Sequence, residues 1–348
     1  MSWIIIFLLV TWTFAFGYFP LVTPGLPVSQ NTILGLVTSL VFFGSVLVHE
    51  LSHSVVARRN GLMVNIITLF IFGGASHLED EPGTPWVEFK MAFAGPLSSL
   101  ILGILFYGFS LASISNLGIY AMLQVLAMVN IILGVFNLLP GFPLDGGRVF
   151  RSIVWHFNRD YLRSTKIAMY GGKTVALVLV FWGIISFIYN FVLGGVWLIL
   201  IGTFLYSLAG ISFRQAEAKE KLSHLKVNEL LNKNYVMVEP KTSLINIFDV
   251  FVREKTDTIF TGENNKVCGF LKLDEVQKID VDEMEKKNAS SLQHRLKNNE
   301  ILTPDDDVLK AVKFMQKEDI SCLPVEKNDR IKGMVCKREI FAALKGVR

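Results

Sequence analysis

The segment VLVHELSHSVVA, residues 46–57, places two histidines and a glutamate inside an otherwise apolar stretch. Ionisable side chains within a membrane span cost about 2.5–3.5 kcal/mol each on insertion scales, so their presence there indicates a function. His49 and His53 are four residues apart and therefore lie one above the other on a helical face. A pair of satisfied core histidines is the alternative, but lipid supplies no hydrogen-bond partners for them.

A metal ion is the partner that this spacing predicts. Both imidazoles can reach one Zn²⁺ at about 2.0–2.1 Å. Glu50 is the next residue and projects beside the metal, where it can accept a proton from bound water instead of binding the ion. This is the HExxH pattern of zinc metalloproteases. The chain has only 6 histidines in 348 residues, so a chance match is a weak explanation.

A catalytic zinc ion usually has three protein ligands and one water. The best candidate for the third ligand is Asp145, in NLLPGFPLDGGR at residues 137–148. Without the paired histidines, an Asp before Gly-Gly would indicate a simple turn. With them, we predict one zinc ion per chain, held by His49, His53 and Asp145. Rival ligands, for which a solvated loop is the alternative, form one polar cluster: His77, Glu79, Asp80 and Glu81.

The charges along the chain separate into two parts. Hydrophobic residues make up 51% of the sequence, which is too apolar for an ordinary soluble protein of this size. Only 9 of the 34 Lys/Arg and 7 of the 30 Asp/Glu residues precede Arg214. We therefore expect a membrane-embedded domain at residues 1–213 and a charged soluble domain at residues 214–348. The net charge of +4 gives no reason to expect a nucleic acid as partner.

Six apolar segments predict a polytopic α-helical membrane protein in contact with the lipid bilayer, since a span needs about 20 such residues. They are Trp3–Phe19, Ile33–Ala57, Met91–Ala112, Ile119–Leu139, Val175–Tyr189 and Val192–Phe213. The first lacks a basic leader, so we interpret it as a retained span. Val64–Leu78 is apolar and β-branched but broken by Gly73-Gly74, which predicts a short membrane-associated β-hairpin.

Loop charges predict the orientation. Every basic residue of the membrane part lies between the second and third spans or between the fourth and fifth: Arg58, Arg59, Lys90, Arg148, Arg151, Arg159, Arg163, Lys166 and Lys173. By the positive-inside rule, these loops, the N-terminus and the soluble domain are cytoplasmic. We expect a multi-pass protein of a prokaryotic plasma membrane. The three cysteines of the soluble domain show no paired spacing, so a disulfide framework is not expected and a reducing cytoplasm fits better.

Three separated motifs occur in order: HELSH at residues 49–53, AGP at 94–96 and NLLPGFPLDGGR at 137–148. Together they resemble the site-2 protease family of intramembrane zinc metalloproteases. The resemblance covers residues 1–213. It implies that Glu50 is the general base, and that the predicted zinc ligands correspond to those of the family. It also implies that the Gly73-Gly74 hairpin presents an edge to an unwound substrate.

One further residue, Asn137, follows from the same resemblance. Asn137 is similar to a family asparagine that helps to hold the substrate or its oxyanion, which would make it catalytic together with Glu50. A capping or inter-helix hydrogen bond is the alternative role for this amide. We expect Gly95 and Pro96 to shape a helix start and close packing, without a chemical role.

The soluble domain contains an internal repeat, at about residues 226–280 and 294–347. Each copy predicts a strand, an amphipathic helix, two further strands and a closing helix, which resembles a pair of cystathionine-β-synthase (CBS) domains. Such α+β pairs commonly sense adenosine nucleotides through a Ser/Thr and an Asp after the last strand. Lys272 and Glu275 occupy those places in the first copy, and Cys336 and Glu339 in the second. Nucleotide binding is therefore in doubt, and a structural module or a homodimer contact is equally open.

These patterns predict an intramembrane metalloendopeptidase. It would hydrolyse peptide bonds of transmembrane or membrane-inserted proteins with zinc-activated water, under regulation by a cytoplasmic CBS pair. The alternatives are a CBS-regulated transporter or channel, and a catalytically inactive sensor. A transporter would show inverted repeats or paired broken helices, which this sequence lacks. An inactive sensor would not need Glu50.

Overall fold

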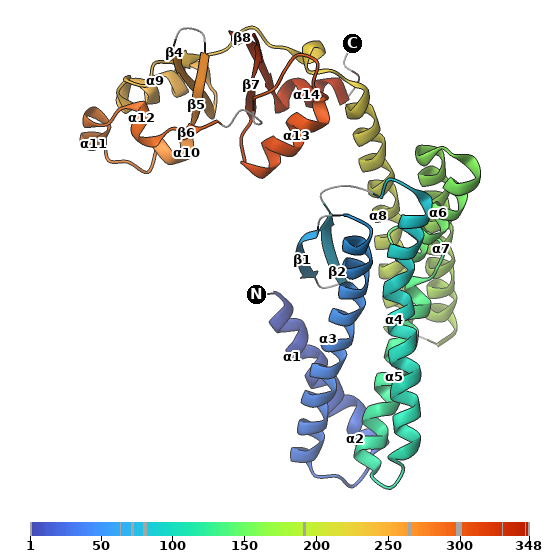
Figure 1. Ribbon diagram of the computed structural model, residues 1–348. Helices are drawn as coiled ribbons and strands as arrows, with labels where there is room; N and C mark the ends of the chain where they lie inside the picture. Colours follow the sequence, from blue (N-terminus) through green and yellow to red (C-terminus); the bar gives the residue numbers. More distant parts are fainter. Residues whose placement is uncertain are drawn as a thin grey trace. The chain divides into compact units, whose positions relative to one another are not determined.

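The protein is described here by a computed structural model that covers residues 2–62, 64–70, 73–78, 82–190, 193–263, 266–296, 301–328, 330–344 and 346. The chain divides into two compact units, Met1–Arg214 and Gln215–Arg348. The first unit consists of long apolar helices and one hairpin (Figure 1). The second consists of short strands and helices.

The helices of the first unit are α1 (Ser2–Trp12), α2 (Phe19–Val22), α3 (Val28–Arg59), α4 (Pro85–Ala112), α5 (Leu117–Asn137), α6 (Asp145–Asn158), α7 (Tyr161–Asn190) and α8 (Leu193–His224), with a π-helical stretch between α1 and α2. Among the described residues, six segments are long and apolar enough to cross a membrane. The prediction of six spans is thus confirmed. Several boundaries were wrong, because the helices extend into the expected loops, and Lys90 for example lies within α4. Lys173 was expected in a loop, but α7 begins at Tyr161 and contains it.

Helices α3, α4 and α5 lie side by side, with α4 in contact with both neighbours (Figure 1). Small residues allow this close approach. A Cβ built at Gly103 would lie 2.6 Å from Ile131, and one built at Gly134 would lie 2.8 Å from Leu100. Helices in lipid associate through such tight contacts, because lipid tails are as apolar as the side chains and give no hydrophobic driving force.

The predicted hairpin is present. Strands β1 (Val64–Phe70) and β2 (Gly73–Leu78) pair antiparallel, with Phe70 opposite Gly73, and the hairpin contacts α3. The described residues include no third strand paired with it.

The second unit contains two similar strand pairs. Its elements are η2 (Val227–Leu230), β3 (Met237–Val238), α9 (Leu244–Glu254), β4 (Thr258–Glu263), β5 (Lys266–Lys272), α10 (Leu273–Val276), α11 (Val281–Lys286), α12 (Ala289–Leu292), β6 (His294–Arg295), α13 (Val308–Lys317), β7 (Cys322–Lys327), β8 (Arg330–Cys336) and α14 (Lys337–Leu344). Strand β4 pairs with β5 in the register that joins β7 to β8, with a bulge at the same place. This equivalence bears out the internal repeat.

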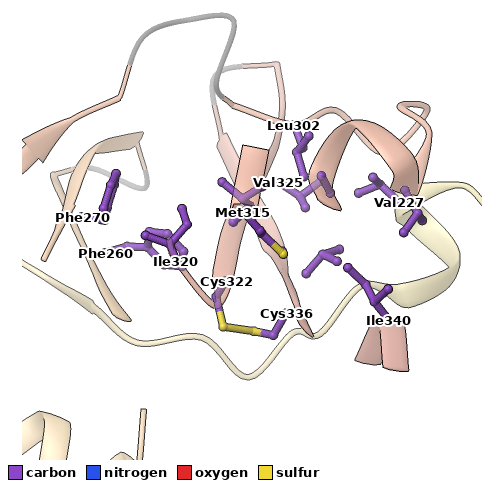
Figure 2. Packing of buried hydrophobic residues seen from close by; sticks show 14 of the residues in the cluster. Val227, Phe260, Phe270, Leu302, Met315, Ile320, Cys322, Val325, Cys336 and Ile340 are labelled. Atoms are coloured by element: carbon purple, nitrogen blue, oxygen red, sulfur yellow. A yellow bond between two sulfur atoms is a disulfide. The ribbon is translucent and has the colours of Figure 1, made fainter. Parts of the chain in front are cut away.

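One hydrophobic core joins the two repeats. Phe260 and Phe270 of the first repeat pack in the same cluster as Met315 and Ile320 of the second (Figure 2). Val227, at the start of the first repeat, also belongs to this cluster. The two repeats therefore bury apolar surface against each other and form one module.

The cysteine expectation was wrong. Cys322 and Cys336 form a disulfide, with Cα atoms 4.0 Å apart (Figure 2). They face each other directly across the β7–β8 ladder, where side chains of neighbouring strands come closest. The sequence separation of 14 residues between Cys322 and Cys336 does not indicate a disulfide, because the pairing depends on the register of β7 and β8. Cys268 is free and exposed.

Candidate active site

The predicted metal ligands come together at one point between α3, α4 and α6. Nε2 of His49 lies 3.2 Å from Oδ2 of Asp145, and Nε2 of His53 lies 3.1 Å from the same oxygen. Both histidines are buried in α3, and the carboxylate is the first residue of α6. The two histidines, four residues apart on one helix, thus lie beside the same carboxylate oxygen, although Asp145 is almost a hundred residues away in the sequence. Their role as ligands remains a prediction.

Helix α4 orients both imidazole rings. Nδ1 of His53 lies 2.7 Å from the carbonyl oxygen of Met91. A carbonyl only accepts, so Nδ1 donates, and Nε2 is the nitrogen that faces Asp145. Nδ1 of His49 lies 2.8 Å from the hydroxyl of Ser99, which is fully buried. Metal-binding histidines typically have such a partner on their second nitrogen.

Gly95 makes room for the rings. A Cβ at this position would lie 2.1 Å from Nε2 of His53 and 2.6 Å from Nε2 of His49. The expectation that Gly95 and Pro96 shape a helix start was wrong, because α4 begins at Pro85 and contains both. The close packing that was expected there is present, and the atoms packed against Gly95 are those of the candidate site.

The donor set fits a zinc ion. Bonds of about 2.0–2.1 Å at tetrahedral angles place two ligand atoms about 3.3 Å apart. The Nε2–Oδ2 separations of 3.1 and 3.2 Å are close to that value, and the three ligand atoms all lie within 4.8 Å of one another. Two imidazoles and one carboxylate match a catalytic zinc site, which leaves a fourth position for water.

Burial alone would raise the pKa of Asp145, but hydrogen bonds from His49 and His53 outweigh burial and hold that pKa below its ordinary range. The carboxylate is therefore ionised, as metal binding requires.

Two glycines let the loop before α6 pack tightly. A Cβ at Gly146 would lie 2.3 Å from the backbone of Leu138, and one at Gly147 would lie 2.3 Å from the backbone of Gly141. Gly141 in turn lies against α7, where its Cβ would meet Gly172 at 2.1 Å. These direct contacts between backbone segments hold the start of α6 in place and so restrict the position of Asp145.

A buried ion pair, which the sequence reasoning missed, joins α4 to α6. Glu88 is fully buried, and Nε of Arg151 donates to its Oε1 at 3.0 Å. The guanidinium also lies over two aromatic rings, 4.9 Å from Phe142 and 4.6 Å from Tyr161. Arg151 follows Asp145 by six residues on the same helix, so the pair fixes that helix beside α4. The sequence feature that could have indicated this pair is Glu88, the acidic residue in the first turn of the mostly apolar helix α4.

Glu50 and Asn137 have different surroundings. Glu50 is buried in α3 directly after His49. Asn137 is the last residue of α5, is half-buried, and its side chain makes no hydrogen bond with a described residue. Of the rival ligands, Glu79, Asp80 and Glu81 lie outside the described residues, and only the backbone of His77 is described.

The chain is similar to known zinc metalloproteases. Residues 37–116 and 109–183 match peptidase family M50, and residues 296–346 match the CBS domain. The chain is 30% identical to zinc metalloprotease MJ0392 of Methanocaldococcus jannaschii over 329 residues, which cover 94% of this chain and 91% of the relative. Among solved structures it is similar to a site-2 protease from Methanocaldococcus jannaschii, with 33% identity, a TM-score of 0.42, and coverage of 60% of this chain and 87% of that one.

Proposed function

Because the chain belongs to peptidase family M50, the site-2 proteases, we propose that it cuts membrane-inserted protein segments at the centre formed by His49, His53 and Asp145. It is a zinc metallopeptidase of a family whose general activity is intramembrane proteolysis. This membership sets aside the transporter and channel alternative. The observation that carries the proposal is the convergence of both Nε2 atoms on Oδ2 of Asp145 inside an apolar helical unit.

Each side chain has a proposed task. The two histidines and Asp145 hold one zinc ion, which when bound polarises the scissile carbonyl and activates water. Glu50 accepts the proton that the attacking water loses and delivers it to the leaving nitrogen. Asn137 donates from its amide to the carbonyl oxygen as negative charge develops there.

The substrate must be extended at the cut. A helical segment hides its carbonyls in hydrogen bonds, so a transmembrane substrate has to unwind locally before hydrolysis. The β1–β2 hairpin contacts α3, the helix that carries the histidines. Strand edges bind extended peptides through backbone hydrogen bonds. We therefore propose that an edge of this hairpin holds the unwound segment.

Zinc content and cleavage, measured together, test the proposal. The full chain and three variants, Glu50→Gln, Asp145→Ala and His77→Ala, are purified in detergent and assayed with a generic membrane-spanning substrate. We expect about one zinc per chain in the parent, Glu50→Gln and His77→Ala, as three-ligand sites hold the ion without the base. Cleavage should be lost in Glu50→Gln and retained in His77→Ala.

Asp145→Ala should lose both zinc and cleavage. Full zinc in Asp145→Ala would move the third ligand elsewhere, and loss of zinc in His77→Ala would bring the rival cluster forward. A parent chain without zinc would overturn the proposal as a whole.

We also propose that the soluble unit is a cytoplasmic regulatory module. The distribution of basic residues supports the orientation. Its contacts favour control through packing or dimerisation over nucleotide binding. Glu275 lies 2.7 Å from His294, Glu339 accepts from Asn232 at 3.1 Å, and Cys336 is held in the disulfide. The ammonium of Lys272 donates to the carbonyl oxygen of Glu318, so all four positions that would contact a nucleotide have partners within the protein.

A further inference from the structure

A second polar site lies between α7 and α8, away from the histidine centre. A pocket of about 450 Å³ opens there, and its lining includes Lys173, Tyr206, Ser207 and Arg214. The ammonium of Lys173 lies over the ring of Tyr206, 5.0 Å from its centroid. Both helices that line the pocket are long and apolar enough to cross a membrane.

The pocket has positive charge without a matching carboxylate. Residues 161–214 contain four basic side chains and no Asp or Glu. Neither Lys173 nor Arg214 forms an ion pair with a described carboxylate. A cation inside a membrane helix is costly unless it is paired or reaches polar surroundings. An anion from the surroundings would therefore be favoured here.

Apolar surface continues from the pocket along both helices. Leu177 follows Lys173 by one turn, and Leu200 precedes Ser207 by two turns on the same face of α8. Both leucines are largely exposed, at 57% and 53%. A ligand with a negatively charged head and an apolar tail would match the pocket and the surface beyond it.

We propose that this pocket binds the phosphate headgroup of an anionic membrane lipid. Lys173 and Arg214 carry the charge that recognises the phosphate, and the hydroxyls of Ser207 and Tyr206 can donate to its oxygens. The acyl chains lie along the exposed leucines. Basic pockets between membrane helices are typical places for anionic headgroups.

The pocket adjoins the support of the histidine centre. Met169, which lines it, packs in one cluster with Phe142 of the loop before α6. Gly172, next to Lys173, touches the same loop. A bound lipid would thus hold α7 and α8 together beside the segment that positions Asp145.

Lipid titration of the full chain tests the proposal. The delipidated protein in a non-ionic detergent is titrated with fluorescent phosphatidylglycerol. The double variant Lys173→Gln/Arg214→Gln should bind about tenfold or more weakly, since each near-surface cation contributes about 1 kcal/mol to anionic-lipid binding. The matched control, Arg58→Gln/Arg59→Gln, removes two exposed cations at the end of α3 and should bind like the parent. Zinc content checks that each variant is folded.

Two further arms keep the test decisive. The charge-preserving variant Lys173→Arg/Arg214→Lys should bind like the parent, and phosphatidylcholine should not compete. Millimolar inorganic phosphate should compete poorly, because it lacks the acyl chains. Competition by free phosphate as strong as by lipid would overturn the lipid assignment. Equal loss of binding in the control pair, or none in the double variant, would overturn the site.

Discussion

Gly95 sits where the two imidazoles come closest to α4. Because Gly95 has no side chain, Nε2 of both histidines can occupy the space where a Cβ atom would lie. On propensity alone, Gly→Ala within a helix should stabilise it by about 0.5–1 kcal/mol. At this position the added methyl would overlap the candidate ligand atoms, so steric exclusion outweighs propensity.

We predict that Gly95→Ala loses zinc and proteolysis while the helix remains folded. The matched control is Gly108→Ala on the same helix, where a Cβ would meet nothing within 4 Å. Zinc per chain, helical content and cleavage are measured for both variants. Full zinc in Gly95→Ala would mean that the rings can move aside, and would weaken the proposed site.

At the scale of elements, the site depends on how α6 is held against α4. Asp145 and Arg151 belong to the same helix, and Arg151 is buried against Glu88. Removing one partner of a buried pair leaves an uncompensated charge, which costs about 3–5 kcal/mol. Replacing both partners avoids that cost, because neither charge is left alone.

We predict that Glu88→Gln lowers the thermal unfolding temperature and the zinc affinity together. The double variant Glu88→Gln/Arg151→Gln should lose less than the sum of the two single changes. Arg148→Gln is the control, since its guanidinium is 3.8 Å from Glu88 and more exposed. Additive effects in the double variant would show that the pair does not couple α4 to α6.

Hydropathy and motif spacing predicted much of these elements. The six spans and the hairpin follow from local patterns, because each pattern reflects one helix or one turn. The approach of Asp145 to the histidines follows from the three ligands that a catalytic zinc ion requires. The sequence did not reveal Arg151 against Glu88 or Cys322 against Cys336. Each of these pairs forms only when two elements dock in a particular register. Such contacts depend on tertiary packing, which leaves no periodic signal in the chain.

At the scale of the whole molecule, a membrane peptidase is joined to a repeated soluble module. The β4–β5 and β7–β8 pairs have the same register, so Lys272 at the end of β5 is equivalent to Cys336 at the end of β8. In both copies, the carboxylate at this place is engaged internally, Glu275 by His294 and Glu339 by Asn232.

We predict that the full chain shows no saturable binding of ATP or AMP in the micromolar range. The internal contacts would have to break, and no hydroxyl stands at Lys272 or Cys336. Calorimetric titration of the purified chain measures this. Saturable binding that Glu339→Ala abolishes would contradict the prediction and support nucleotide sensing.

Which side of the membrane holds the soluble unit is the question on which two observations disagree. Loop charges predict the cytoplasmic side, whereas a disulfide is typical of oxidising compartments. Cys268 can decide, because it is free and exposed while Cys322 and Cys336 are buried. We predict that a membrane-impermeant maleimide labels the protein in inverted vesicles and leaves it unlabelled in intact cells. Cys268→Ser should remove the signal. Labelling in intact cells would place the soluble unit outside, where the disulfide would persist and cytoplasmic ligands could not reach it.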